Sequence, residues 1–466
     1  MYRYKAITLR NFRELPQVAS SLSEDEKFNI EVVGNVLPFK VNPYVVNELI
    51  DWNNYQYDPI YILTFPQKEM LQAAHFQEMA DAIVGEASRA ELKLIANKIR
   101  LELNPHPAGQ MEYNVPILQD SKLKGIQHKY RETMLFFPSQ GQTCHAYCTF
   151  CFRWTQFVGM NDLKFAMKDI GLVIKYLQGH PKITDVLFTG GDPLIMRTKI
   201  LGKYIEALLD AKIPNLKTIR LGSKALAYHP HRFVTDEDAD ELLRIFEKAK
   251  KAGVHIAFMA HFNHPNELKT DIAKQAIGRI LNTGAVIRTQ SPIMRNINDN
   301  ADAWATMWQE QVELGCVPYY MFLARDTGAQ HYFAVSLENS WKIFRKAYQR
   351  VSGIARTVRG PSMSAGPGKV QVVGISKVAG QKVFVLQFIQ GRNPDWVNRP
   401  FFAEYNPKAI WLDDLNPAFG KTEFFFENEY PIKRKERPSS RMNLPTIISR
   451  TNGRKKDVHK KSTASF

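Results

Sequence analysis

Cysteine and long apolar runs are both scarce in this chain. Its 466 residues include four cysteines, too few for a small domain held together by disulfides. No apolar run approaches the roughly 20 residues that a membrane-spanning helix needs, and the first ten residues lack the apolar core of a signal peptide. The 44% hydrophobic and 23% charged residues are typical of a globular enzyme. We therefore expect a cytoplasmic protein with no membrane partner.

Acidic residues are in deficit, and the net charge is +16. Residues 431–466 hold eleven lysines and arginines against Glu436 and Asp457, so they carry +9 and the other 430 residues carry +7. This segment also has few large apolar residues and no aromatic residues interleaved for base stacking. A solvated, disordered tail is the favoured interpretation, and nucleic-acid binding the weaker alternative.

Three of the four cysteines fall within eight positions, as Cys144-x3-Cys148-x2-Cys151. Thiolates this close select zinc or an iron–sulfur cluster. A zinc site completed by His145 is one interpretation. A [4Fe-4S] cluster, which normally takes four cysteines, would keep one iron open for chemistry. The spacing resembles the cluster motif of the radical S-adenosylmethionine (SAM) superfamily, while the isolated Cys316 is read as a core residue.

The middle of the chain alternates apolar strands with amphipathic helices. Strands are predicted at residues 134–137, 184–189, 218–221, 254–260, 285–288 and 317–323. The intervening helices are predicted to begin at a cap formed by Asn161 and Asp162, near Lys199, at a cap formed by Thr235, and near Asp271, Asp302 and Glu338. Strict alternation implies parallel strands joined by right-handed crossovers. We predict an α/β fold, a partial (β/α)6 TIM-like barrel.

Four regions are expected along the chain. Residues 1–115, with helices at 68–83 and 90–103, form a mainly helical appendage. Residues 116–360 form the barrel core, and residues 361–430 a small C-terminal β-containing region. Residues 431–466 form the basic tail.

Unusual residues follow every predicted strand. They are the cysteine loop, Gly190-Gly191-Asp192, Gly222-Ser223-Lys224, His261-Phe-Asn263-His264, Thr289-Gln290-Ser291 and Arg325-Asp326. Because barrel active sites lie at the C-terminal ends of the strands, these residues predict one site. Glycines at 190 and 191 would let a ligand approach the backbone, and Asp192 could accept from an ammonium. The histidine block could hydrogen-bond a cofactor or serve only in packing.

A lysine ends the glycine-rich segment Gly366-Pro367-Gly368-Lys369. A pair of strands, at 370–373 and 382–386, is predicted to follow it. A lysine in such a loop can reach into a cavity and form a Schiff base. The alternative is an ordinary solvated loop lysine.

Taken in order, these motifs resemble the lysine 2,3-aminomutase family of radical SAM enzymes. The resemblance runs from about Tyr44 to Gln390 and rests most specifically on the block His261-Phe-Asn-His-Pro-Asn-Glu267. It implies an isomerase that carries a [4Fe-4S] cluster, SAM and pyridoxal 5′-phosphate, and that moves an α-amino group to Cβ by a radical route. It also implies a small amino-acid substrate and an electron donor such as flavodoxin or ferredoxin. A homo-oligomer is possible.

The resemblance assigns roles to particular residues. Cys144, Cys148 and Cys151 would hold the cluster, and Gly190, Gly191, Asp192, His261 and Gln290 would bind cofactor. Lys369 matches the family's pyridoxal-phosphate lysine, and Arg153 matches its arginine for the substrate carboxylate. Lys129 and Arg131 lie where the family binds the cofactor phosphate, although the local spacing differs.

Two departures from the family bear on substrate and assembly. Lysine-specific members hold the distal ammonium with two aspartates, and the matching positions here are Arg325 and Ser362. An ammonium facing Arg325 would be disfavoured, so we expect glutamate or another non-lysine substrate unless Asp326 takes over. No cysteine follows Cys316, so the C-terminal zinc site of clostridial-type members has no counterpart.

Three alternatives stay open on the sequence. One is lysine 2,3-aminomutase proper. Another is the related branch that modifies an elongation-factor lysine, whose members lack the pyridoxal-phosphate lysine. The remote one is a metal-stapled nucleic-acid-binding protein that uses the basic tail.

Overall fold

A computed structural model describes residues 4–104, 114–159 and 164–430. The described part of the chain belongs to one compact unit. The expected boundaries after residues 115 and 360 stay predictions. The basic tail and the predicted cap at Asn161 and Asp162 lie outside the described residues.

One sheet of eleven strands organises the molecule, in the order β13-β12-β11-β10-β9-β8-β7-β6-β5-β4-β3. Seven neighbouring strands, β4 to β10, run parallel. They are β4 (Thr133–Phe136), β5 (Asp185–Phe188), β6 (Thr218–Ser223), β7 (His255–His261), β8 (Val286–Ile293), β9 (Val317–Leu323) and β10 (Arg359–Ser364). Antiparallel strands extend both edges: β3 (Ile126–Tyr130) at one, and β11 (Gly368–Val378), β12 (Gln381–Gly391) and β13 (Pro400–Glu404) at the other.

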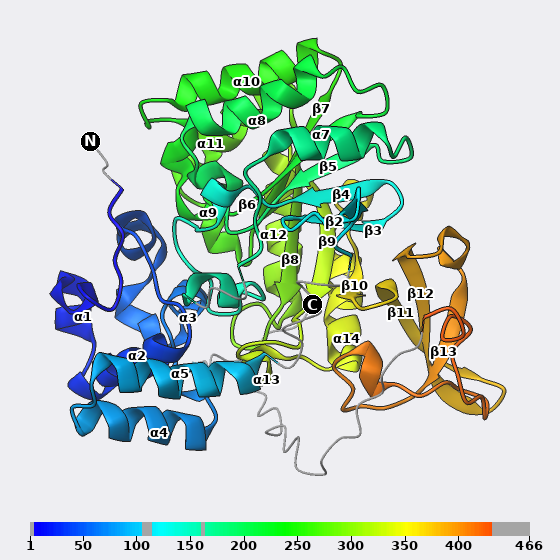
Figure 1. Cartoon of the computed structure of the whole chain (residues 1–466). Helices are drawn as coiled ribbons and strands as arrows, with labels where there is room; N and C mark the ends of the chain where they lie inside the picture. The colour runs from blue at the N-terminus through cyan, green and yellow to red at the C-terminus, as the bar shows by residue number, and fades with distance from the viewer. Residues whose placement is uncertain (1–3, 105–113, 160–163, 431–466) are drawn as a thin grey trace, which may run out of the picture. The chain divides into compact units, whose positions relative to one another are not determined.

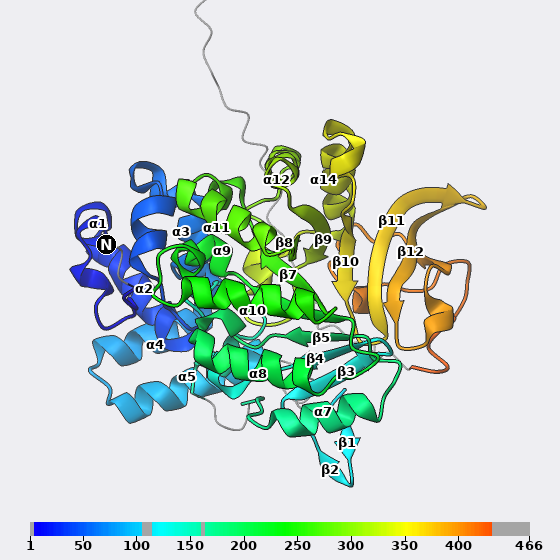
Figure 2. The same ribbon diagram turned by 90° about the horizontal axis from the view of Figure 1, so that it is seen from above.

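Helices cross over between consecutive parallel strands. They are α7 (Ile170–Gln178), α8 (Thr198–Asp210), α10 (Ala239–Lys251), α11 (Asp271–Asn282), α12 (Ala301–Glu313) and α14 (Leu337–Arg350). The strand order never reverses, so right-handed crossovers put every helix on the same face of the sheet. In Figure 2 these helices form an outer layer around the strands. The predicted partial (β/α)6 barrel is confirmed.

Burial alternates along the strands as this arrangement requires. On β6, Ile219 and Leu221 are buried toward the helices, whereas Arg220 and Gly222 on the other face are half-buried. On β8, Ile287 is buried in the same way and Arg288 is half-buried. The face opposite the helices is therefore polar and partly accessible.

Two predicted helices begin later in the described residues than expected. The helix expected after Asn161 and Asp162 begins at Ile170, where the Asp169 carboxylate accepts from the backbone N–H of Gly171 at 2.8 Å. Residues just before it run alongside Pro138 through a parallel bridge at Met167 instead. The helix expected at Thr235 begins at Ala239, because the Thr235 hydroxyl that would cap it is hydrogen-bonded to the His231 ring at 2.8 Å.

The N-terminal region is helical, as expected, and Figure 1 shows its helices in blue. Its elements are η1 (Phe12–Glu14), α1 (Pro16–Ser21), α2 (Glu24–Val36), η2 (Val45–Leu49), η3 (Trp52–Tyr57), α3 (Pro59–Thr64), η4 (Lys68–Met70), α4 (Ala73–Val84) and α5 (Arg89–Leu103). The helix predicted at 68–83 is split in two, because the backbone turns extended at Leu71 and Gln72. Capping boxes start α2 at Ser23 and α5 at Ser88.

The predicted strand pair after Lys369 is the β11–β12 hairpin, which is longer than expected. Its two-residue turn places Ala379 and Gly380 at φ 47° and 80°, as a tight hairpin turn requires. A two-stranded sheet of β1 (Ile117–Leu118) and β2 (Ser121–Lys122) was not predicted. Within the described ranges, every helix is too short or too polar to cross a membrane.

Candidate active site

The cysteine loop leaves the C-terminal end of β4. It starts with the short helix η5 (Ser139–Gly141) and ends with η6 (Trp154–Phe157). Cys144, Cys148 and Cys151 are all free and half-buried. The loop therefore stands where barrel enzymes carry out their chemistry.

The N-terminal appendage holds this loop. The backbone N–H of Tyr147 donates to the Lys40 carbonyl at 2.7 Å, and that of Thr149 to the Leu63 carbonyl at 2.9 Å. The Lys40 ammonium donates to the Thr143 hydroxyl at 2.7 Å. Sequence reasoning missed these residues, because nothing in a helical segment marks it as a support for a loop a hundred residues away.

The three thiols share one buried environment. Burial raises the pKa of Cys148 to about 12 and also raises the pKa values of Cys144 and Cys151. The negative charge of a Cys151 thiolate would raise the pKa values of Cys144 and Cys148 further. Because these thiols are shielded from water, losing a proton costs free energy when no metal is present. A bound cluster would stabilise them as thiolates.

The zinc interpretation finds no support in this geometry. Over the described ranges, no three histidine, cysteine, aspartate or glutamate side chains converge as the ligands of one metal ion. The ring of His145 instead stacks on His229, with centroids 4.5 Å apart. The charges of Cys148 and Cys151 act on Cys144, so the three thiols are near one another, and three cysteines without a fourth match a cluster that keeps one iron open.

The glycines at 190 and 191 bring the end of β5 against the cysteine loop. A Cβ on Gly191 would lie 2.3 Å from the Thr143 carbonyl oxygen, and one on Gly190 would lie 2.2 Å from the Gln142 side-chain nitrogen. The Asp192 backbone N–H then donates to the Thr143 carbonyl at 2.7 Å. The glycines thus serve packing of the loop, in addition to any ligand contact.

Asp192 is buried and already accepts several hydrogen bonds. One carboxylate oxygen accepts from the Leu194 backbone N–H at 2.9 Å. The other accepts from the Ser223 hydroxyl at 2.9 Å and from the Lys224 backbone N–H at 2.8 Å. Burial raises the pKa of this carboxyl group, and these donors oppose the rise. The side chain joins the ends of β5 and β6, a role that the sequence did not indicate.

The histidine block after β7 divides into two parts. Asn263 and Glu267 are fully buried and bind the Lys224 ammonium at 2.7 and 2.6 Å. His264 accepts from the Asn266 backbone N–H at 3.3 Å and caps a short helix. Packing is the structural role of these residues. His261 instead lies beside the cysteine loop, its ring 5.7 Å from that of Phe150, and pairs in register with Gln290 on β8.

Lys369 lies at the start of β11, over two aromatic rings. Its Nζ is 3.9 Å from the centroid of the Tyr320 ring and 5.4 Å from that of Phe322. It also donates to the Gln390 side-chain oxygen at 3.1 Å. Burial, followed by the charges of Arg359 and Arg220, lowers its pKa to about 7. The amine is therefore poised as a nucleophile near neutral pH, rather than solvated in a loop.

Arg153 is a buried cation with unused donors. Its side chain stacks on the Phe137 ring, with Cζ 4.2 Å from the centroid. Its Nε and Nη2 have no hydrogen-bond partner among the described residues. Burial lowers its pKa to about 10. Burying a guanidinium whose N–H groups have no acceptor costs free energy, and a bound anion would supply those acceptors. Arg153 therefore fits a carboxylate ligand.

The two predicted phosphate residues are separated by the structure. Lys129 donates to the Ala365 carbonyl, at the turn that leads to Lys369. Arg131 is exposed in the β3–β4 turn, at the N-terminal edge of the parallel strands, where it pairs with Glu132. Arg392, which no sequence motif singled out, donates to the Gly366 carbonyl at 3.0 Å. Lys129 and Arg392 therefore flank the glycine turn, and Arg131 does not reach it.

Positive charge is concentrated here. The pKa of Lys129 is lowered well below its usual value by burial and then by Arg325, Arg392 and Lys369. Arg325 stacks over Phe152, next to Cys151, at 5.2 Å from the ring centroid. Ser362 is buried on β10, opposite Phe322, and donates to the Met321 carbonyl at 3.3 Å. The site thus suits anionic groups.

Comparison with known proteins identifies the family. A protein of Aquifex aeolicus named "Putative L-lysine 2,3-aminomutase" is 32% identical over 410 residues, which cover 88% of this chain and 94% of that protein. The chain belongs to the lysine 2,3-aminomutase family. An L-lysine 2,3-aminomutase of Methanococcus maripaludis is 24% identical over 78% of this chain and 72% of its own length. No protein-family profile matches the chain.

Membership of the lysine 2,3-aminomutase family makes the protein an enzyme of the isomerase class. The family's cofactors are a [4Fe-4S] cluster, SAM and pyridoxal 5′-phosphate. Among solved structures, a radical SAM methyltransferase from Sphaerobacter thermophilus aligns with a TM-score of 0.37 and 12% identity, over 64% of this chain and 95% of that one. At this score the match carries no weight, and the barrel follows from the strand order.

Proposed function

We propose that the protein is a radical SAM, pyridoxal-phosphate-dependent amino-acid 2,3-aminomutase with a non-lysine substrate, glutamate being the first candidate. The observation that carries this proposal is the buried Arg153 guanidinium with two unpartnered nitrogens, in a site that also holds Lys369 and the cysteine loop. These three features together suit a substrate carboxylate, a carbonyl cofactor and a cluster.

When bound, the cofactors supply a radical that removes a hydrogen atom and a carbonyl group that carries the migrating nitrogen. Cys144, Cys148 and Cys151 would hold the cluster. His261 and Gln290, which pair in register beside the loop, would bind SAM together with Gly190, Gly191 and Asp192.

The lysine and its surroundings would bind pyridoxal phosphate. Lys369 holds its Nζ over Tyr320, where burial favours the neutral amine that can attack a carbonyl. Lys129 and Arg392, on either side of the Ala365–Gly368 turn, would receive the phosphate. Arg153 would orient the α-carboxylate with its free nitrogens, which holds the amino acid in one pose.

The charge around the far end of the site supports the substrate assignment. Arg325 occupies the place of one family aspartate and Ser362 that of the other, while Lys129 and Arg392 add positive charge nearby. An ammonium would be repelled here, whereas a side-chain carboxylate would gain a charge-assisted hydrogen bond of about 1.5–3 kcal/mol. Asp326 is the residue that could reverse this preference.

The remaining parts of the proposal concern context. An electron donor such as flavodoxin or ferredoxin would reduce the cluster, in the cytoplasm, and the enzyme could form a homo-oligomer. The elongation-factor-modifying branch is disfavoured because its members lack the lysine found here at 369. Nucleic-acid binding would depend on the tail, outside the described residues.

Anaerobic reconstitution followed by a product screen tests the proposal. The protein would be loaded with iron, sulfide, pyridoxal phosphate and SAM, reduced, and offered lysine, glutamate, arginine, ornithine and β-amino acids. We expect β-glutamate from glutamate, and no product from Lys369→Ala. Efficient turnover of lysine with none of glutamate would overturn the substrate assignment, and stoichiometric zinc without iron uptake would overturn the enzyme class.

A further inference from the structure

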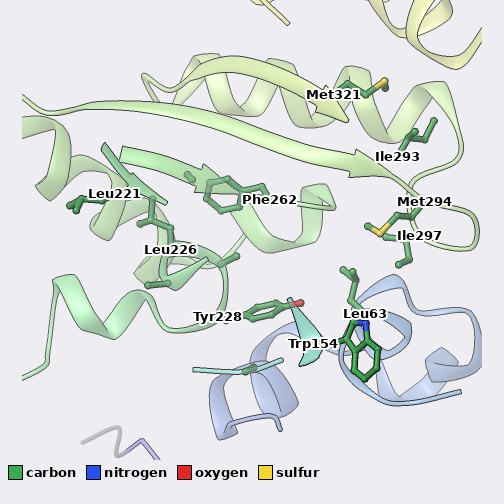
Figure 3. Packing of buried hydrophobic residues seen from close by; sticks show 14 of the residues in the cluster. Leu63, Trp154, Leu221, Leu226, Tyr228, Phe262, Ile293, Met294, Ile297 and Met321 are labelled. Atoms are coloured by element: carbon green, nitrogen blue, oxygen red, sulfur yellow. The ribbon is translucent and has the colours of Figure 1, made fainter. Parts of the chain in front are cut away.

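A tyrosine lies against one of the three cysteines of the loop. The Cys148 Sγ and the Tyr228 hydroxyl are 3.7 Å apart, within hydrogen-bonding range for sulfur. Tyr228 ends the short helix α9 (Ala225–Tyr228) after β6 and is 1% exposed. Figure 3 draws Tyr228 among buried hydrophobic residues, with its hydroxyl pointing toward Leu63 and Trp154. In the cluster-free protein the Cys148 thiol donates to the Tyr228 oxygen. A thiolate sulfur that binds a cluster can only accept, so the phenol would then turn its proton toward it.

The ring of Tyr228 carries a cation on its face. The Lys224 Nζ lies 4.3 Å from the ring centroid. That ammonium is fixed by Glu267 at 2.6 Å and by the Asn263 side-chain oxygen at 2.7 Å. Both acceptors are fully buried, so the cation has one position. A cation over the ring draws electron density from the phenol, which makes its O–H a stronger donor.

This contact distinguishes Cys148 from its neighbours. Over the described residues, Cys148 is the one of the three with a side-chain partner at its sulfur, the Tyr228 phenol, whereas the Cys151 sulfur accepts a backbone hydrogen bond from Arg153. The Lys224 charge also acts directly on Cys148, where it opposes the effect of burial. Cys148 is therefore the described cluster cysteine whose hydrogen-bond partner a side-chain substitution can remove.

We propose that Tyr228 is a positioning residue that donates a hydrogen bond to the Cys148 sulfur of the bound cluster, and that Lys224, held by Glu267, strengthens this bond. The inference rests on the proposed cluster binding. Donors and cations near a cluster sulfur stabilise the reduced, more negative cluster. The Tyr228–Lys224–Glu267 chain thus raises the reduction potential and makes the cluster easier to reduce.

The test is a redox titration of the reconstituted protein, followed by EPR of the reduced cluster. Tyr228→Phe removes the donor and keeps the ring. We expect the ratio of reduced to oxidised cluster, at the wild-type midpoint potential, to fall about tenfold, which is 59 mV for one electron. The matched control is Tyr44→Phe, since Tyr44 is also 1% exposed but its hydroxyl bonds Thr270 at 2.7 Å.

A second measurement does not depend on a variant that holds its cluster. In wild-type protein exchanged into D2O, ENDOR of the reduced cluster should detect a second coupled exchangeable deuteron, besides that of the Arg153 backbone N–H at Cys151. An unchanged midpoint in Tyr228→Phe, or wild-type cluster with no such deuteron, overturns the inference. Both results require protein with full iron content, so they contradict the role of Tyr228 and not cluster binding. A wild-type protein that takes up no iron would instead refute the proposed function.

Discussion

The Nζ of Lys369 and the Cζ of Arg359 share one aromatic ring, at 3.9 and 4.6 Å from the centroid of Tyr320. Two cations on one buried ring repel each other, and the lysine is the one that can lose its proton. Burial lowers the pKa of Lys369 most and the charge of Arg359 lowers it further, so a residue in a glycine-rich turn becomes a reactive amine. Several measurable properties depend on it and on the cations around it.

The apo protein should lose stability as the pH falls toward 7. The pKa of Lys369 is about 7 in the folded protein and about 10.4 in an unfolded chain. Between these values the unfolded chain binds more protons, so the free energy of unfolding contributed by this group rises with pH. At about pH 6, Lys369→Met should be more stable than wild type in urea, and the difference should vanish near pH 10. Lys346→Met, on the exposed face of α14, should show no such trend.

Lys369 should also be the site of cofactor attachment. Incubated with pyridoxal phosphate, the protein should gain an imine absorbance, and borohydride should leave the label on Lys369 in a peptide map. Arg359→Met removes a neighbouring cation, so it should shift the pH profile of labelling to higher pH. An unchanged spectrum in Lys369→Ala would assign the cofactor to another residue.

Arg153→Met should keep or raise the stability of the apo protein while it lowers the activity of the enzyme. The unpartnered nitrogens of Arg153 cost the apo protein about 1–3 kcal/mol, so the variant should unfold at equal or higher urea concentration. Turnover efficiency should fall about a hundredfold, since a charge-assisted hydrogen bond contributes about 1.5–3 kcal/mol. Arg232→Met is the matched control. Arg232 is equally buried but bonds Leu194, Thr198 and Asp238, so its loss should destabilise the fold.

Arg325 should decide between acidic and basic substrates. Arg325→Ala removes a charge-assisted hydrogen bond of about 1.5–3 kcal/mol, and should lower turnover efficiency on glutamate roughly ten- to a hundredfold. Arg325→Asp combined with Ser362→Asp restores the acidic pair of the lysine enzymes and should shift preference toward lysine. Competition between the two substrates measures this shift directly. Efficient wild-type turnover of lysine with none of glutamate would contradict this prediction, and Asp326 would then be the residue that binds the substrate ammonium.

Cys148→Ala should abolish the cluster without unfolding the barrel. The cysteine loop lies outside the strands and is held by backbone hydrogen bonds to Lys40 and Leu63, which the substitution leaves in place. Iron content should fall to background while the urea midpoint stays near that of wild type. Full iron content in this variant would contradict the assignment of the cluster ligands.

The sequence by itself determined the barrel and predicted a site at the C-terminal ends of its strands. Periodicity located six of the seven described parallel strands, because local patterns record which face of an element is buried, but it missed β10. The first residues of the helices were harder to predict from the sequence. The cap predicted at Thr235 failed because the hydroxyl that would cap the helix is hydrogen-bonded to the His231 ring instead.

Only the tertiary structure decided what each site residue contacts. It put Arg392 beside the Lys369 turn and Arg131 at the opposite edge, and it gave Asp192 hydrogen bonds to Ser223 and Lys224. It joined Lys40 to the cysteine loop and Tyr228 to Cys148. Such contacts join residues up to a few hundred positions apart, so no local pattern encodes them. They arise when parallel strands bring their C-terminal ends to one edge and the surrounding loops pack together in three dimensions.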